Sequence, residues 1–588
     1  MGTISDKLMR IINTKEDIRQ ALISKGYDVP TSIPFKEYAK MILDLPCKVD
    51  SFPDIEGIVA RYSASGLTNE QMAANPVWVD KTSNGHDLQL KNLAWGGMSG
   101  VGGYADNWNS SADWSINGYW VNSYTDHKLQ FIKASSVVQA RSNNIYNAEN
   151  VYKNILNVNG LTEAVNKGSV KALRIIATDP ITSKAIKTLS FDSDGVIQIS
   201  FDDVLQDCYV AYFLFGNNTN DIDITIEQLP LYPGALVFDG VDDYGVCDNF
   251  PILTKEKGYT VVALRQWDQD FLNTTLTGGL LSTRNYSTGE GVAFEKIESS
   301  NKGYWNLGAG GIIDFAKSPF TWQTSKQYNN VGILKGDKNH GKPLCVGCGL
   351  SGGQQCGRFA IWELVFLDHD ATEEELNKIK DYFVKTYPWL FPDQAWTVVG
   401  KTNEDEDRAT IANITGNGND LILSNFGFAE GSGYNEEGEY AGYLVTDGVD
   451  DKIISSIFKM GNYWTVIGDW ELINTGKNDN AGIVKFDSIV IYNYNSMLIN
   501  IKNGRNILIP DQNTVNAICS DGRIYSKDWK ESIYNEETES TSKNFLTIGY
   551  SGNTYTKIAF KNLAIYPTVL SREDCIKAYN YLQTLKAK

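Results

Sequence analysis

One five-residue string occurs twice in this chain without change, and this repetition limits what the chain can fold into. The string Asp-Gly-Val-Asp-Asp occupies residues 239–243 and again residues 447–451. Two other motifs recur in the same order: Thr-Asn-Glu at 68–70 and 402–404, and Asn-Gly-x-Asp-Leu-x-Leu-x-Asn at 84–92 and 417–425. An apolar segment at 361–367 also pairs with one at 560–566. Landmarks that return in one order indicate two copies of one structural unit.

The two copies differ in length at one place. The offset between them is 333 residues at the Asn-Gly motif and 208 residues at the aspartate string. The first copy therefore carries about 125 additional residues between Asn92 and Asp239. Because this length is close to the usual size of a domain, we expect an inserted module with its own core. Its strands are expected at 170–177, 196–201, 209–215 and 222–226.

The composition favours a β-rich globular protein and narrows the choice of partners. Aromatic residues make up 12% of the 588 residues, and 52 glycines supply turns. The net charge of −18 argues against nucleic acid or an anionic membrane as a partner, since both bind basic surfaces. The start of the chain lacks the apolar region of a signal peptide, so we expect synthesis in a host bacterial cytoplasm without export. The eight dispersed cysteines are expected to be free thiols.

The first residues have the spacing of an amphipathic helix. Its apolar stripe consists of Ile4, Leu8, Ile11, Ile12, Ile18 and Leu22. A second short helix is expected at 35–45, and two helices of this size cannot bury a core by themselves. We therefore predict an anchor segment that docks on another protein or on further copies of this chain, as a dimer or trimer. A helical hairpin packed against the β structure of its own chain is the alternative.

The rest of the chain alternates short apolar runs with glycine and asparagine turns, which is the pattern of β structure. We predict a mainly β fold: tandem jelly-roll β-sandwiches, a small inserted β-sandwich and the N-terminal helical anchor. Each copy is expected to end on a helix, capped by Thr372 in the first copy and by Ser571 in the second. The predicted units are 1–47, 54–104, 105–230, 231–392 and 393–588.

The second part of each copy resembles a known family of β domains. In the first copy a strand at 235–238 runs into the aspartate string, and strands at 344–347 and 361–367 precede the Thr372 helix. The second copy matches at 443–447, at 545–549 and at Ser571. This order is similar to concanavalin A-like and laminin-G-like jelly rolls, over about residues 231–392 and 440–588. The resemblance implies jelly rolls that end with a strand followed by a short capped helix.

The N-terminal segment resembles a second pattern. Its motifs are Thr-Lys-Glu-Asp-Ile at 14–18, Lys-Gly at 25–26 and Ile-Pro-Phe-Lys-Glu-Tyr-Ala at 33–39. They are similar to the short helical attachment segments of bacteriophage tail and fibre proteins. With the Asn-Gly motif upstream of the jelly rolls, the chain resembles virion appendage proteins, head or tail fibres, of crAss-like phages of Bacteroides-type gut bacteria. The resemblance implies a virion location, other virion proteins as partners of the anchor, and a homo-oligomer.

The aspartate strings admit two interpretations. Carboxylates are ligands for Ca²⁺, but adjacent Asp242 and Asp243 point to opposite sides of an extended segment, so at most one can share a site with Asp239. The alternative is a tight turn, in which the Asp side chains accept backbone N–H groups and Gly240 adopts an unusual conformation. The absence of EF-hand spacing favours the turn.

A C-x-x-C motif is compatible with a zinc site, whose ligands would be His340, Cys345, Cys348 and Cys356. Cysteines three apart in a strand face opposite ways, however, and the second copy has no cysteine at the matching positions 546–549. The pattern therefore favours small buried thiols. We predict neither a metal nor a cofactor.

The start of the insertion is the candidate binding surface. Aromatic residues interleave there with Asn and Ser, and the four that we single out for glycan contact are Trp108, Trp114, Tyr119 and Trp120. Aromatic faces stack on sugar C–H groups, and amides bond sugar hydroxyls. The alternative is that these aromatics form the core of the β-sandwich.

No residue pattern predicts catalysis. The Glu373–Glu375 run falls in a first helical turn, where negative charge is favourable, and none of the four histidines lies in a catalytic motif. We therefore expect a non-enzymatic bacteriophage structural protein whose N-terminal helices attach it to the virion and whose β domains meet host-surface or environmental glycans. A virion glycan depolymerase and a bacterial glycan-binding adhesion module are the alternatives.

Overall fold

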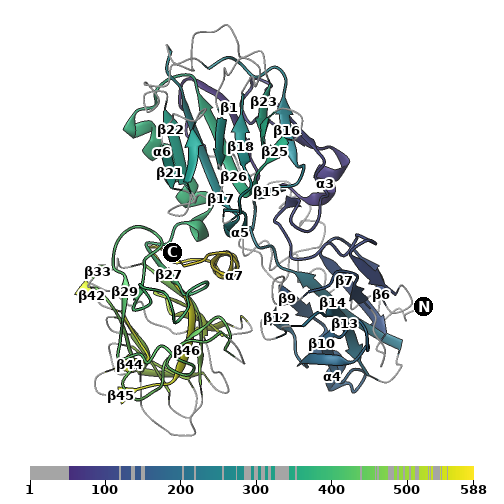
Figure 1. Ribbon diagram of the computed structural model, residues 1–588, viewed down its shortest axis with the longest axis vertical. Helices are drawn as coiled ribbons and strands as arrows, with labels where there is room; N and C mark the ends of the chain where they lie inside the picture. Colours follow the sequence, from purple (N-terminus) through teal and green to yellow (C-terminus); the bar gives the residue numbers. More distant parts are fainter. Residues whose placement is uncertain are drawn as a thin grey trace, which may run out of the picture.

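The computed structural model describes residues 52–587 apart from short gaps, the longest of which cover 284–292, 325–342, 474–481 and 534–542. The predicted anchor at 1–47 lies outside the described residues. The protein is mainly β, as its sequence predicts. Figure 1 shows three β-rich lobes, with the first jelly roll at the top, the second at the lower left and the inserted module at the lower right.

The first jelly roll has two sheets, built from residues on both sides of the insertion. The six-stranded sheet contains β22 (Phe320–Thr324), β17 (Thr260–Trp267), β26 (Arg358–Leu367), β15 (Leu236–Asp239) and β4 (Gly100–Val101), with β1 (Ile58–Ser63) also paired to β26. The ten-stranded sheet contains β2 (Val77–Trp78), β3 (Leu88–Lys91), β16 (Tyr244–Cys247), β23 (Leu344–Val346), β18 (Gly278–Ser282), β19 (Ala293–Lys296), β20 (Lys302–Trp305), β21 (Ile312–Asp314), β24 (Cys348–Leu350) and β25 (Gln354–Cys356). Buried residues such as Trp78, Trp267 and Phe366 form one apolar cluster in this unit.

The second jelly roll repeats this arrangement. One eight-stranded sheet contains β30 (Gly433–Tyr434), β31 (Leu444–Val445), β46 (Ile558–Tyr566), β34 (Thr465–Leu472), β39 (Val515–Cys519), β40 (Arg523–Ser526) and β41 (Glu531–Ile533), with β27 (Gln394–Thr397) paired to β46. The other contains β28 (Thr410–Ile411), β29 (Leu421–Ser424), β32 (Lys452–Ser455), β43 (Leu546–Ile548), β35 (Gly482–Phe486), β36 (Ile489–Asn493), β37 (Met497–Ile501) and β38 (Arg505–Ile509). Two small ribbons pair β33 (Phe458–Lys459) with β42 (Lys543–Asn544), and β44 (Tyr550–Ser551) with β45 (Thr554–Tyr555).

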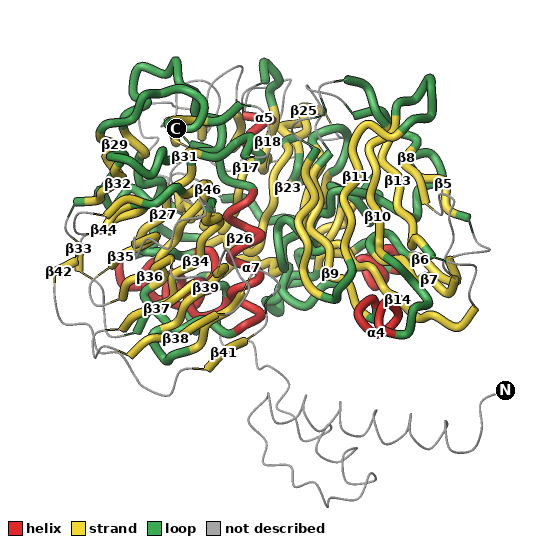
Figure 2. The backbone as a smooth tube through the Cα atoms, turned by 90° about the horizontal axis from the view of Figure 1, so that it is seen from below, coloured by secondary structure: helices red, strands yellow, loops and turns green. Residues whose placement is uncertain are grey.

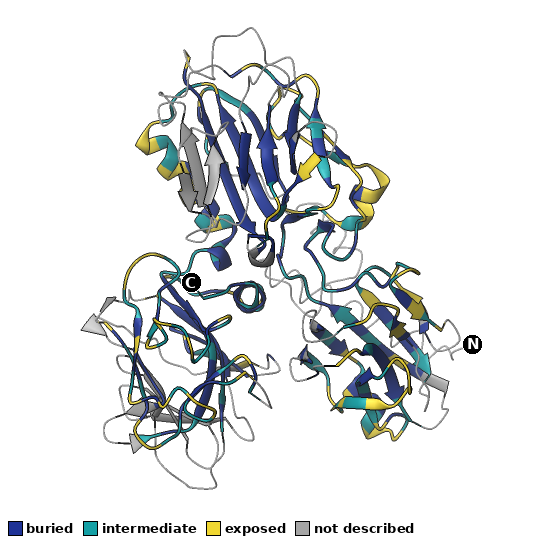
Figure 3. Ribbon diagram, viewed as in Figure 1, coloured by how far each residue is buried: buried dark blue, intermediate teal, exposed yellow. Residues whose placement is uncertain are grey.

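The inserted module is a sandwich of two five-stranded antiparallel sheets. The first contains β11 (Ala185–Phe191), β10 (Ala172–Thr178), β13 (Tyr209–Phe215), β8 (Ala140–Ser142) and β5 (Trp114–Ile116). The second contains β12 (Gly195–Ser200), β9 (Lys153–Asn159), β14 (Asn220–Gln228), β7 (Lys128–Lys133) and β6 (Val121–Tyr124). The four strands predicted from the sequence correspond to β10, β12, β13 and β14, and their inward residues form a separate core. Figure 3 shows this core as dark blue strands with exposed loops around them.

The insertion interrupts a single β-hairpin. In the second copy β30 and β31 form the hairpin, and the N–H of Asn435 donates to the carbonyl of Tyr443 at 2.9 Å. The first copy keeps this bond between β4 and β15, where the N–H of Gly102 donates to the carbonyl of Ala235 at 2.8 Å. The returning chain lies beside the departing one, because the N–H of Tyr232 donates to the carbonyl of Gly102 at 2.8 Å. The module therefore replaces the tip of a hairpin.

The predicted caps of the closing helices are confirmed. Helix α6 (Glu373–Thr386) begins with a capping box, in which the Thr372 hydroxyl accepts the N–H of Glu375 at 3.3 Å and the Glu375 carboxylate accepts the N–H of Thr372 at 2.7 Å. Helix α7 (Arg572–Gln583) begins at Ser571, whose hydroxyl accepts the N–H of Asp574 at 3.1 Å. The acidic first turn of α6 thus has a structural role.

The closing helix of the second copy joins the two jelly rolls. Figure 1 shows α7 between these lobes, and the buried residues of α6, of α7 and of the 3₁₀ turn η2 (Pro388–Leu390) share one apolar cluster with both copies. The hydroxyl of Tyr581 donates to Gln266 Oε1 of the first copy at 3.2 Å. The hydroxyl of Tyr566 donates to the carbonyl of Trp389 at 3.0 Å.

The other helices of the described residues are short. They are α3 (Asn69–Ala74), α4 (Leu161–Asn166) and α5 (Gln269–Leu272). Figure 2 shows how few red helical segments accompany the yellow strands. In the described ranges, no helix has the length and apolar character needed to cross a membrane.

Candidate functional site

An open pocket lies on the inserted module, in the region that the sequence singles out. Its volume is about 810 Å³, within the range of small-ligand sites. The loop before β5 and the strand itself supply most of the lining, and β6, β8 and β13 supply the rest. The polar part of the lining includes exposed Asn109, Ser111 and Asn117. A pocket that combines the exposed ring of Tyr124 with amides and hydroxyls can contact both the C–H and the O–H groups of a sugar.

Trp108 and Trp114 form the inner wall of this pocket and belong to the core of the module. Their exposed fractions are only 1% and 3%, and both rings pack against Tyr212, with centroids 5.8 and 5.5 Å away. The prediction of exposed stacking residues needs correction here, because burial removes the free ring faces that stacking requires. Tyr119 and Trp120 lie outside the described residues.

A buried carboxylate, Asp106, holds the inner wall in place. The indole N–H of Trp114 donates to Asp106 Oδ1 at 3.3 Å, the Tyr152 hydroxyl donates to Oδ2 at 2.6 Å, and the Asn154 amide donates to Oδ2 at 3.0 Å. Burial raises the pKa of Asp106 to about 6, although these hydrogen bonds act to lower it. A lone aspartate at the start of the insertion belongs to no motif, so sequence reasoning missed it.

Three residues of the outer rim were also missed. Tyr124 ends β6 and is 46% exposed. Arg141 lies on β8 and Tyr209 begins β13, and the guanidinium carbon lies 4.9 Å from the centre of the Tyr209 ring. Arg141 also pairs directly across from Ser115 of β5. These residues are far apart in the chain. The pairing of β13 with β8 brings Tyr209 near Arg141, and Tyr124 comes from β6 of the other sheet.

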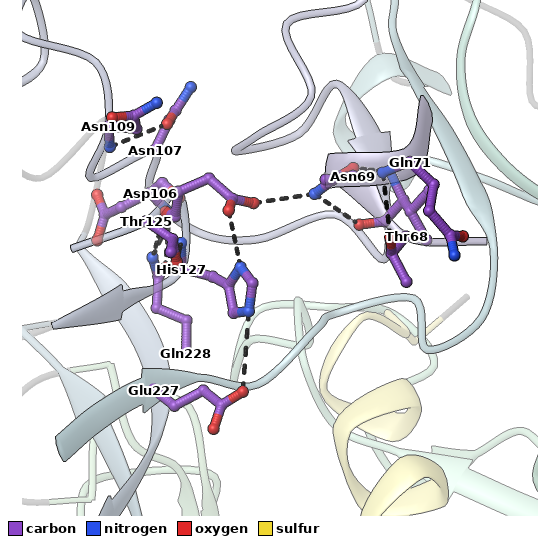
Figure 4. Close-up of polar contacts among 12 residues, drawn as sticks. Thr68, Asn69, Gln71, Asp106, Asn107, Asn109, Thr125, His127, Glu227 and Gln228 are labelled. Atoms are coloured by element: carbon purple, nitrogen blue, oxygen red, sulfur yellow. Dashed lines mark hydrogen bonds and ion pairs between the residues drawn. The ribbon is translucent and has the colours of Figure 1, made fainter. Parts of the chain in front are cut away.

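A polar cluster joins the insertion to the first jelly roll (Figure 4). Asn69 of α3 accepts the N–H of Val101 at 2.7 Å and donates to Asp126 of the insertion at 2.9 Å. His127 lies between carboxylates, 2.9 Å from Asp126 Oδ1 and 3.8 Å from Glu227 Oε1. Burial opposes the charged form of His127, but the hydrogen bond and charge of Asp126 outweigh it and raise the pKa of the imidazole. This cluster fixes the module at its point of entry.

Both aspartate strings form the tight turn favoured by the sequence. Gly240 has a left-handed φ of 79°, the N–H of Val241 donates to Asp239 Oδ1 at 2.7 Å, and the N–H of Asp239 donates to Asp243 Oδ2 at 3.0 Å. The second copy has the same bonds. One expectation was wrong: the carboxylates of all three aspartates in each string lie within 4.8 Å of one another, because side chains do not alternate in a turn. Backbone donors account for the placement of the first and last aspartate of each string.

The cysteine motif differs from the expectation of free thiols. Cys345 and Cys348 form a disulfide. Gly347 between them has a φ of 93° and separates β23 from β24, so the alternation of a continuous strand does not apply. Cys356 packs beside them as a buried thiol, and burial raises its pKa to about 12. His340, the fourth residue of the considered zinc set, lies outside the described residues.

No family model matches this chain, and no curated protein matches it. Solved structures with some similarity include the receptor binding domain of botulinum neurotoxin D, at 11% identity and a TM-score of 0.22, which covers 57% of this chain and 89% of that one. Another is a Trypanosoma rangeli sialidase in complex with sialic acid, at 9% identity and a TM-score of 0.22, which covers 79% of this chain and 83% of that one. At these values we transfer no function from either protein.

Proposed function

We propose that this protein is a non-enzymatic, glycan-binding structural protein of a bacteriophage virion. The inserted module carries the glycan site, and the tandem jelly rolls form the support that presents it. The observation that carries the glycan part of the proposal is the pocket of about 810 Å³ on the module. The virion part rests on the resemblance of residues 14–39 to phage attachment segments and on the apolar stripe from Ile4 to Leu22.

The chemistry of the pocket fits a carbohydrate better than an apolar ligand. Asn109 lies on its exposed side and offers an amide donor and an amide acceptor, and Ser111 adds a hydroxyl. Tyr124 places an exposed ring at the rim, where one face of a pyranose can pack on it. The buried carboxylate of Asp106 accepts hydrogen bonds from Trp114, Tyr152 and Asn154. It therefore supports the wall of the pocket and does not face the ligand.

Glycan binding by the full chain tests this proposal. Immobilised polysaccharides from host bacteria should bind the purified protein, and Tyr124→Ala should weaken binding by about three- to tenfold, because one aromatic contact is lost. Tyr463→Ala is the matched control, since Tyr463 is 68% exposed in the second copy and lies outside the pocket. Equal loss in both variants, or no binding at all, would refute the pocket as the glycan site.

Two further measurements separate the proposal from its alternatives. Bound polysaccharide should keep its chain length after long incubation, whereas a depolymerase would shorten it. Phage particles made with a chain that lacks residues 1–46 should not contain the protein, because several apolar side chains, each worth about 1.5–3 kcal/mol when buried, would be missing from the attachment. Normal incorporation of the truncated chain would refute the anchor.

A further inference from the structure

We infer that the pocket takes an acidic glycan, and that Arg141 binds the carboxylate of that sugar. The inference rests on the proposed glycan-binding function and adds the chemical class of the ligand. It depends on the charge, the geometry and the free donors of one side chain.

The charge of the pocket differs from that of the whole chain. The net charge of the protein is −18, yet Arg141 is the single charged residue among the described residues of the lining, and no Asp or Glu is present there. The neighbouring acid Asp113 lies outside the lining, and its Oδ1 accepts the side-chain amide of Asn144 at 3.2 Å. A carboxylate that enters the pocket therefore meets a positive charge with no competing acid in the described lining.

The guanidinium of Arg141 is held in position but not neutralised. It lies over the Tyr209 ring, 4.9 Å from the ring centre, and such a contact restrains the side chain. With the described part of the chain, Arg141 forms no ion pair and no side-chain hydrogen bond. Across the strand pair, the hydroxyl of Ser115 donates to Asn143 Oδ1 at 2.8 Å. The planar fork of N–H donors is thus available for bidentate binding of a carboxylate.

A second arginine of the same sheet provides a matched control. Arg174 of β10 lies over Phe215 of β13, with the guanidinium carbon 3.7 Å from the ring centre. The two arginines thus make the same kind of contact with the same strand, but Arg174 is not part of the pocket lining. Arg141→Gln removes a positive charge inside the pocket, whereas Arg174→Gln removes one elsewhere on the module. Comparison of the two variants shows whether the position of the charge matters.

The experiment measures binding of the full chain to an array of neutral oligosaccharides, of oligosaccharides that contain uronic or sialic acid, and of the methyl esters of those acids. The wild-type protein should bind at least one acidic glycan at least about tenfold more tightly than its methyl ester, the range for a hydrogen bond to a charged group. Arg141→Gln should remove that difference, because it weakens binding of the acid more than binding of its ester. Arg174→Gln should keep the difference.

Each other outcome overturns the inference in a distinguishable way. If the acid and its ester bind equally, or if Arg141→Gln keeps the preference for the acid, the pocket is a neutral-glycan site and the proposed function stands without this inference. If Arg141→Gln and Arg174→Gln lose the preference equally, the effect comes from the overall charge of the module. If no glycan on the array binds, the proposed function itself fails.

Discussion

The two jelly rolls have the same hydrogen bonds where their sequences repeat. They differ at two places: the first copy carries the inserted module, and its core contains a buried ion pair. Asn69 and Asn403 occupy equivalent places, and each side chain accepts a backbone N–H of a short strand, from Val101 at 2.7 Å and from Tyr434 at 2.8 Å. In the first copy the amide of Asn69 also donates to Asp126 of the insertion. In the second copy the Asn403 amide donates to the carbonyl of Tyr434 at 2.7 Å, and in the first copy the Asn69 amide lies 3.4 Å from the matching carbonyl of Val101. The repeated motif thus maintains the frame, and the insertion attaches through an amide that the frame also uses.

A second difference lies in the cores. The first copy buries an ion pair, in which Arg61 Nε lies 3.1 Å from Glu363 Oε2, and their side chains are 4% and 0% exposed. The equivalent positions in the second copy hold Ala395 and Asn562, since β1 and β27 pair with β26 and β46 in the same register. The same jelly-roll fold therefore accommodates either a buried ion pair or two uncharged residues at these two equivalent positions.

The largest effect is expected from removal of the insertion. Deletion of residues 105–230, with a short Gly-Ser linker from Tyr104 to Leu231, should abolish glycan binding while both jelly rolls stay folded. The reason is that the second copy closes the same hairpin with a short loop, and the bond from Gly102 to Ala235 remains. Calorimetry of the deleted chain should retain the cooperative transition of the jelly rolls. Loss of that transition would mean that the module is integral to the first copy.

The next effect is expected from the buried ion pair. Glu363→Gln should destabilise the first jelly roll by about 3–5 kcal/mol, because it leaves the Arg61 guanidinium buried without its counter-charge. The Tyr387 hydroxyl, which donates to Glu363 Oε1 at 2.8 Å, keeps an acceptor in the amide oxygen of glutamine, so the variant tests the loss of charge. Urea unfolding, followed by fluorescence, measures this loss.

The control for this prediction introduces the two uncharged residues of the second copy into the first copy. Arg61→Ala combined with Glu363→Asn gives the first copy the residues of Ala395 and Asn562, and it should recover most of the lost stability. If the double variant is as unstable as Glu363→Gln, the pair is not interchangeable and the comparison between the cores fails.

The sequence predicted the frame well because the frame consists of local signals. The glycine of each aspartate turn and the hydroxyls of Thr372 and Ser571 act within a few residues of their own positions, and repetition confirms them. The pocket was predicted only in part. Its segment was found, and burial of Trp108 and Trp114 was the stated alternative to glycan contact. The approach of Arg141 to Tyr209 was not predicted, because it depends on strand pairing. The disulfide was missed because a C-x-x-C motif does not reveal the left-handed Gly347.

The third prediction concerns pH. Burial, followed by the charge of Asp239, raises the pKa of Asp243 to about 7, well above the ordinary value of about 4 in an unfolded chain. The folded state then holds more protons than the unfolded state between about pH 4 and 7, so the contribution of Asp243 to stability falls as the pH rises through this window. Asp243→Asn should therefore gain stability relative to wild type as the pH rises from 4 to 8.

Melting temperatures across that range measure the gain. The exposed Asp242 of the same turn makes only the smallest contribution to the raised pKa of Asp243, so Asp242→Asn should show a much smaller pH dependence. The second copy sharpens the test, because burial raises the pKa of Asp451 only to about 6. For Asp451→Asn the relative gain should therefore end about one pH unit earlier. A constant difference between Asp243→Asn and wild type at every pH would contradict the assignment.

The smallest expected effect concerns the serine beside each turn. In the second copy the Ser432 hydroxyl donates to Asp451 Oδ1 at 3.1 Å. In the first copy the equivalent Ser99 also acts to lower the pKa of Asp243, although Asp243 Oδ1 makes no close hydrogen bond. A hydrogen bond to the charged form lowers the pKa of a carboxyl group, so Ser432→Ala should raise the pKa of Asp451 from about 6 towards the value of Asp243. Carboxyl-carbon NMR titration of Asp451 measures this shift, expected to be at most about one unit, or about 1.4 kcal/mol. Ser99→Ala, at the equivalent position of the first copy, should shift Asp243 less, and an unchanged titration of Asp451 would show that the difference between the copies comes from burial alone.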